Sequence, residues 1–227
     1  MQRLLQRNQH AIASTQAATE RARLLAQRVL LLARHWRLDD VPEALSDAEA
    51  AVAASADRRA AAELSLARGV ARYYGAQIGS ALEPVREARD AAILLGDAGL
   101  EAECEAWLGC VRGTLHHDPD EVLPHLRQAV ALGTAQRPLA AARGLYVAAT
   151  LYHEADLIDD AVRHYRRASS LARAEHDEQL VAAVHRYMTL AQAQQVRRAR
   201  AAGRLDGEQL KQALAGLGSA QQLASAL

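Results

Sequence analysis

Phenylalanine is missing from this 227-residue sequence, aromatic residues make up 4% of it, and proline occurs at five positions. Lysine occurs once, at Lys211, against 26 arginines, and basic and acidic residues balance at 27 each. A β-sandwich or a parallel sheet needs many β-branched and aromatic residues, which are scarce here. The balanced charge creates no overall field that would attract nucleic acid or an anionic membrane. These absences argue against a β-rich fold and against a polyelectrolyte-binding protein.

No segment approaches the roughly 20 apolar residues that a membrane-spanning helix needs, and the polar N-terminus has no apolar core of signal-peptide length. We therefore expect a cytoplasmic protein with no membrane contact. Cys104 and Cys110 lie six positions apart in one predicted helix, so their side chains point to different sides and should not pair. They form no CxxC motif, and free buried thiols in a reducing compartment are the simplest interpretation.

What the sequence does contain is alanine, at 52 positions, together with leucine, arginine, glutamate and glutamine. These residues are good helix formers, and they predict an all-α fold. A small–bulky–Ala pattern on one helical face, spaced i, i+4, i+7, recurs along the chain with periods of 37, 41 and 39 residues. Its first positions are Ala44, Ala81, Val122 and Ala161. Repeats of this kind are typical of helix pairs stacked side by side.

Each repeat begins with another helical stretch and a short polar loop, which favours antiparallel neighbours. The stretches are 21–36, 60–74, 99–115 and 139–153. Pro42 and Pro119 suit helix starts, where the missing N–H needs no partner. Gly96 and Gly133 are predicted to end helices in the left-handed conformation.

These residues resemble the tetratricopeptide-repeat family, in the longer-period form common in bacterial signalling and regulatory proteins. Trp107-Leu108-Gly109 is similar to the family's Trp/Leu-Gly step, and Ala149, Tyr152, Ala161, Tyr165 and Ala168 match its small, aromatic and Ala positions. The resemblance implies a right-handed superhelix of about four to five repeats. The polar, Gln-rich start and two helix-start signals near the end, at Asp206 and Ser219, add two regions to the repeats. We therefore expect a lead-in helix or arm over 1–20, the repeats over 21–204, and capping or linker helices over 205–227.

No catalytic motif occurs in the sequence: HExxH, GxSxG and P-loop patterns are all absent. His116, His117 and Asp118 form the densest group of metal-ligand types, but adjacent side chains in a loop rarely converge on one ion, so we expect a solvated turn with a helix cap. The dense basic patch of Arg197, Arg198, Arg200 and Arg204 is local and matches a helix C-terminus. We expect no enzyme, cofactor, metal or direct nucleic-acid binding, and a metal-dependent enzyme is a minor alternative.

The family's first helix lines the concave face of the superhelix, so the resemblance places candidate binding residues there. Such aromatic and charged side chains are typical anchors for a peptide or protein partner. Trp36 and Tyr74 have a second interpretation, as plugs between neighbouring helices, whereas Tyr152 and Tyr165 are predicted core. The predicted groove residues are Trp36, Arg37, Tyr73, Tyr74, Arg143, Tyr146, Thr150, His153, Glu154 and His185.

Two functions remain open from the sequence. The first is a non-enzymatic scaffold that binds a peptide or protein in its concave groove. The second is the sensory region of a larger bacterial signalling protein with a nucleotide-cyclase output module of the diguanylate type or a DNA-binding one, since the chain ends on an apolar residue, Leu227. Apolar end helices also favour a homodimer.

Overall fold

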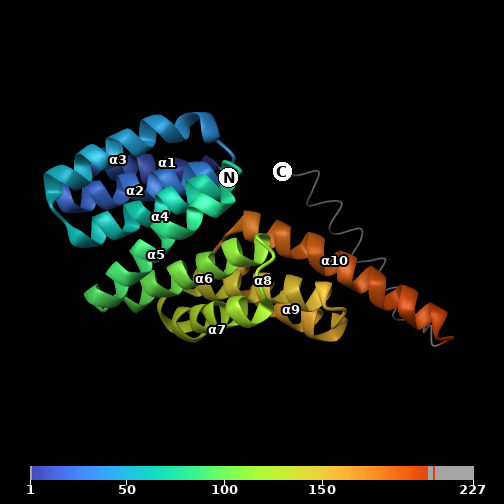
Figure 1. Cartoon of the computed structure of the whole chain (residues 1–227). Helices are drawn as coiled ribbons and strands as arrows, with labels where there is room; N and C mark the ends of the chain where they lie inside the picture. Colours follow the sequence, from blue (N-terminus) through green and yellow to red (C-terminus); the bar gives the residue numbers. More distant parts are fainter. Residues whose placement is uncertain (1, 204–206, 208–227) are drawn as a thin grey trace.

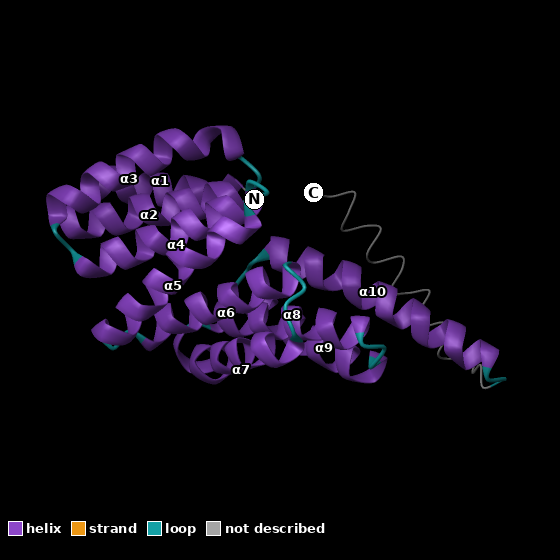
Figure 2. Ribbon diagram, viewed as in Figure 1, coloured by secondary structure: helices purple, strands orange, loops and turns teal. Residues whose placement is uncertain are grey.

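The computed structural model describes residues 2–203 and 207, and within them every regular element is helical (Figure 1, Figure 2). The side chains of residues 2 and 3 are not described. The predicted helices of 205–227 thus lie outside the described residues, Gly207 apart. The elements are α1 (Gln2–Ser14), α2 (Ala18–Arg34), the 3₁₀ helix η1 (Leu38–Asp40), α3 (Val41–Ser55), α4 (Arg58–Tyr74), α5 (Ile78–Leu95), α6 (Ala98–Thr114), α7 (Pro119–Gln136), α8 (Pro138–Glu154), α9 (Ile158–Ala174) and α10 (Glu178–Ala201).

The helices form the predicted antiparallel pairs α2/α3, α4/α5, α6/α7 and α8/α9, with α10 following the last pair. The first helix of each later pair also packs against the second helix of the pair before it, so the pairs stack in sequence order. This is the arrangement that the recurring apolar face predicts, because one helix pair cannot bury that face alone. The all-α prediction is confirmed.

The predicted lead-in segment is a helix. α1 packs on α2, and the Asn8 side chain donates hydrogen bonds to the Leu24 carbonyl at 3.0 Å and to Gln27 Oε1 at 3.3 Å. Asn8 is buried, so this polar anchor fixes where α1 lies on α2. The N-terminal helix therefore packs against the first repeat through α2.

The predicted helix boundaries hold at three points and fail at one. Pro42 and Pro119 lie in first turns, and Gly96 ends α5 with φ +65°. The prediction for Gly133 is wrong, because α7 continues through it to Gln136. Its lack of a side chain serves close packing instead: a Cβ there would lie 2.8 Å from the backbone nitrogen of Ala141 in α8.

The core runs as a series of clusters between successive pairs. Trp107 is 1% exposed, and Tyr165 is fully buried, as predicted for Tyr165. Tyr152 is half-buried and packs against the same cluster as Tyr165. Cys104 is a buried free thiol and Cys110 a partly buried one, so the two do not pair.

The two ends of the stack meet across its inner face, which we define as the side formed by α2, α4, α6, α8 and α10. Arg34, in the last turn of α2, forms an ion pair with Asp177, the residue before α10, although 143 positions separate them. Figure 1 shows α10 beginning beside the N-terminal helices and then extending past α9. The described chain therefore closes on itself around the inner face.

Candidate ligand pocket on the inner face

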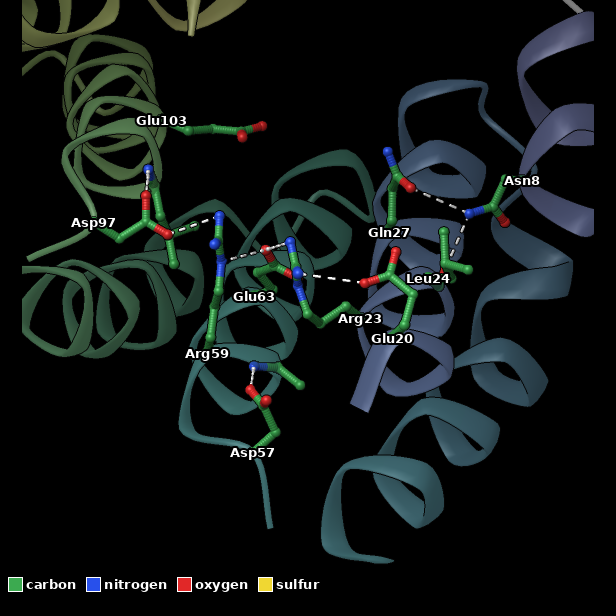
Figure 3. Close-up of polar contacts among 12 residues, drawn as sticks. Asn8, Glu20, Arg23, Leu24, Gln27, Asp57, Arg59, Glu63, Asp97 and Glu103 are labelled. Carbon is green, nitrogen blue, oxygen red and sulfur yellow. Dashed lines mark hydrogen bonds and ion pairs between the residues drawn. The ribbon is translucent and has the colours of Figure 1, made fainter. Parts of the chain in front are cut away.

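Ion pairs connect the first helices of successive pairs on one part of the inner face (Figure 3). Arg23 of α2 contacts Glu63 of α4 at 3.3 Å, and Arg59 contacts both Glu63, at 3.4 Å, and Asp97, at 2.8 Å. Asp97 also accepts a hydrogen bond from the Leu100 amide and so caps α6. This ladder links α2, α4 and α6 by side-chain contacts.

The ladder continues to the last pairs. Arg137, the residue before α8, contacts the buried Glu103 of α6 at 2.7 Å, and the Glu103 carboxylate raises the pKa of Arg137. Figure 3 shows the Glu103 side chain extending away from α6 near this ladder. Together with Arg34–Asp177, these pairs surround a small hollow of about 260 Å³ that is lined by both carboxylates and guanidinium groups. We call it the charged hollow.

A second hollow of about 640 Å³ lies beside the first, and residues from α2, α4, α6, α8 and α10 or from the turns that follow them line it. Arg34 and Arg143 line both hollows and therefore form the partition between them. We call the larger one the aromatic hollow. Its lining includes Trp36, Tyr73, Tyr74, Trp107, Cys110, Tyr146, Gln179, Leu180 and Arg186.

The aromatic side chains of this hollow contact one another edge to face. Tyr74 lies 5.3 Å from Trp36, 5.4 Å from Tyr73 and 6.0 Å from Trp107, measured between ring centroids. Edge-to-face contacts of this kind are the preferred aromatic geometry and add rigidity. Trp36 nevertheless remains 68% exposed, so it contacts Tyr74 without being buried between the helices.

The hydroxyl group of Tyr73 has a fixed partner. It bonds to Thr114 Oγ1 at 3.1 Å, and the Thr114 hydroxyl donates in turn to the Cys110 carbonyl at 2.9 Å, so Tyr73 is the donor. Burial raises the pKa of Tyr73 and also the pKa of Tyr146. Both phenols are therefore neutral donors at ordinary pH, and neither is a candidate base.

Arg143 is the most unusual charged group of the site. It is 6% exposed, and its guanidinium carbon lies 4.3 Å from the centroid of the Trp107 ring. Among the residues that the structure describes, it forms no hydrogen bond or ion pair. Burial, with a further contribution from the nearby charge of Arg34, lowers the pKa of Arg143. A cation–π contact offsets only part of the cost of burying such a charge.

The structure brings half of the sequence-predicted groove residues together. Trp36, Tyr73, Tyr74, Arg143 and Tyr146 line the aromatic hollow. The other five lie outside both hollows and have local partners or solvent. Arg37 forms an ion pair with Asp40, and the Thr150 hydroxyl donates to the Val147 carbonyl. His153 forms a hydrogen bond with Gln194, and Glu154 is exposed at the end of α8. His185 contacts Ser169 and Arg173 of α9.

The sequence reasoning missed Arg34, Trp107, Gln179, Leu180 and Arg186 as lining residues. Trp107 did give a signal, but the repeat motif assigned it to packing, and it packs and lines the hollow at once. The α10 residues gave no such signal in the sequence, because they line the hollow only where the two ends of the stack meet. Cys110 belongs to the same face, and burial raises the pKa of its thiol.

The histidine-rich turn has a structural explanation. Asp118 Oδ1 accepts a hydrogen bond from the Asp120 amide and caps α7, and His117 lies 3.2 Å from Glu121. Within the described ranges, no group of three or more His, Cys, Asp or Glu side chains is arranged to hold a metal ion. Nor is any described helix both long and apolar enough to cross a membrane.

Comparison with known proteins identifies the architecture. Neither a protein-family model nor a curated protein matches the chain. A solved structure does match: a Signal Transduction ATPase with Numerous Domains (STAND) protein with a tetratricopeptide repeat sensor from Pyrococcus horikoshii, with a TM-score of 0.56. The chain has a tetratricopeptide-like fold. At 12% identity the likeness shows the fold alone, and the match covers 78% of this chain but 28% of the archaeal protein.

Proposed function

We propose that this tetratricopeptide-like chain is a non-enzymatic recognition module that holds a segment of a partner, or a ligand, in the aromatic hollow. One observation supports it above the others: all five inner helices, or the turns after them, contribute side chains to a single hollow. Aromatic and arginine side chains in such a position are the residue types that dominate binding energy at interfaces. Apart from Trp36, which lies in the turn after α2, these aromatic and arginine side chains are on helices, which place them more precisely than loops would.

The exposed Trp36 is the natural entry point for a partner. Its ring is 68% exposed but oriented by its edge-to-face contact with Tyr74, so a bound apolar group would cover it at low entropic cost. Removing the Tyr74 ring should therefore weaken binding by about 2 kcal/mol or more, as hot-spot truncations do.

The experiment is affinity capture from an extract of the source organism, followed by mass spectrometry of bound proteins and bound small molecules. Wild type, Tyr74→Ala and a control, Leu94→Ala, are compared. Leu94 is 88% exposed on α5 and does not line the hollow, so its replacement tests for non-specific hydrophobic binding at the surface. The proposal expects a partner that Tyr74→Ala loses and Leu94→Ala keeps, with the same helicity in all three. Equal capture by all three proteins would reject the hollow as the binding site.

We also infer that the module serves a larger signalling protein as its sensory part. The similarity to a STAND protein with a tetratricopeptide repeat sensor favours this second reading, since the match occupies 28% of that protein. An antibody raised against the chain tests it on extracts of the source cells. A band well above 24.5 kDa supports the inference, and a single band at 24.5 kDa contradicts it.

A further inference from the structure

The two hollows of the inner face differ sharply in charge. The charged hollow is lined by Glu20, Glu63, Glu103, Glu175 and Asp177 as well as by arginines. Among the described residues, three arginines line the aromatic hollow, Arg34, Arg143 and Arg186, and no aspartate or glutamate does. Arg34 is neutralised by Asp177, but no ion pair neutralises the other two within the described residues. The aromatic hollow is thus a site of net positive charge.

Within the aromatic hollow, Arg143 is the buried charged group whose hydrogen-bonding capacity is unused by the described residues. Its side chain is more than nine-tenths buried, lines the hollow and forms no hydrogen bond to any described residue. The indole N–H of Trp107, in the same wall, is also buried without a partner among the described residues. Buried polar groups of native proteins are satisfied in the great majority of cases, and the Arg143 guanidinium and the Trp107 indole N–H can both only donate. A ligand with acceptor atoms in the hollow, above all an anionic one, would supply the partner that the Arg143 guanidinium lacks.

The walls set the shape of that ligand. Tyr73, Tyr74 and Trp107 present ring faces and edges, which favour a flat apolar body. A volume of about 640 Å³ falls in the range of about 300–1,000 Å³ that small-molecule sites occupy. The Arg34–Asp177 pair crosses the inner face beside the hollow, which leaves little room for a helix about 10–12 Å wide.

From these observations we propose that the aromatic hollow binds a small molecule that carries a carboxylate or phosphate on a flat apolar body. The guanidinium of Arg143 binds the anionic group, since its planar array of donors suits both oxyanions. The flat body lies among the rings of Tyr73, Tyr74 and Trp107. This proposal rests on the recognition function above and specifies its ligand class.

The protein carries its own reporter for a binding experiment. Its two tryptophans, Trp36 and Trp107, both line the aromatic hollow, so the tryptophan fluorescence of the whole chain, excited selectively over tyrosine, comes from this site. Titration with phenylacetate and phenyl phosphate supplies the anion on a flat ring. Phenylacetamide is the neutral counterpart of phenylacetate, and acetate supplies the anion without the ring.

We expect a saturable fluorescence change with at least one aromatic anion, and at least about tenfold weaker binding of phenylacetamide and acetate, the loss that follows from one charged hydrogen bond. Arg143→Met should lower the affinity for the aromatic anion to that of the wild type for phenylacetamide. It keeps most of the apolar stem and removes an unpaired buried charge, so it should fold. Arg127→Met, an exposed arginine on α7 away from the hollow, should bind as wild type does.

Three results would overturn the proposal: no saturable change with either aromatic anion, equal affinity for phenylacetate and phenylacetamide, or unchanged anion affinity in Arg143→Met. Equal affinity for phenylacetamide and phenylacetate would leave the recognition function intact and reject only the requirement for an anionic group. If Arg143→Met did not fold, the comparison of charged and neutral probes on the wild type would still decide.

Discussion

The ion pair between Arg34 and Asp177 offers the sharpest test of how the stack closes. Both side chains are largely buried, at 11% and 6% exposed, and Asp177 also accepts a hydrogen bond from the Leu180 amide at 3.0 Å. Asp177→Asn removes the charge but keeps an oxygen for the helix cap, because asparagine caps helices as well as aspartate. The substitution therefore isolates the ion pair from the cap.

Breaking a buried ion pair by removing one partner typically costs about 3–5 kcal/mol, because the remaining charge stays buried without compensation. For a chain of this size, a loss of about 3 kcal/mol lowers the midpoint of thermal unfolding by about 6–12 °C. Circular dichroism during heating measures it. Glu49→Gln is the control: Glu49 pairs with Arg68 at the surface, where such a pair contributes at most about 1 kcal/mol.

The same pair predicts a pH dependence with a definite sign. Burial alone would raise the pKa of Asp177, but Arg34, the Leu180 amide and Arg143 together hold it below its usual value. The folded protein thus binds this proton less readily than the unfolded chain, so the contribution of Asp177 to stability is present above about pH 4 and is lost as the pH falls through the folded pKa. The stability difference between wild type and Asp177→Asn should shrink below about pH 4.

The reasoning fails if Asp177→Asn unfolds within about 0.5 kcal/mol of the wild type at neutral pH, the range of ordinary surface substitutions. In that case the positions of α2 and α10 would not depend on each other, and the enclosed shape of the aromatic hollow would not depend on their contact. A stability difference that stays constant from pH 7 to pH 3 would refute the electrostatic origin separately.

Two further predictions concern packing inside the stack. Gly109→Ala should lower stability by about 1–3 kcal/mol despite the better helix propensity of alanine, because a Cβ there would lie 2.3 Å from Leu126 Cδ2. Gly79→Ala, where a Cβ meets nothing within 4 Å, should raise stability by about 0.4–1 kcal/mol, and urea unfolding of both variants distinguishes the two cases. A thiol reagent such as DTNB should react with Cys110 before Cys104 in the folded protein. The reason is that Cys104 is fully buried, and burial raises the pKa of its thiol well above the ordinary value. A faster reaction of Cys104 than of Cys110 would contradict the packing of α6.

Local sequence determined the elements of this fold. Periodic apolar faces, loop lengths and the prolines at positions 42 and 119 predicted the antiparallel pairs, because these signals act within one helix pair or between adjacent pairs. The aromatic residues on the first helices were likewise predictable as a set, since the repeat fixes which face of a helix points inward. The failure at Gly133 came from a contact between α7 and α8 that no turn rule contains.

The tertiary structure alone decided that the inner face is enclosed. Small rotations between successive pairs add up along the stack, and only their sum brings Asp177 to Arg34. It also decided which of the predicted residues share one hollow: Tyr146 lies in it, whereas His185 on α10 contacts α9. A pattern of side chains along the sequence specifies neighbours in a helix, but the curvature of the whole stack specifies which distant side chains meet.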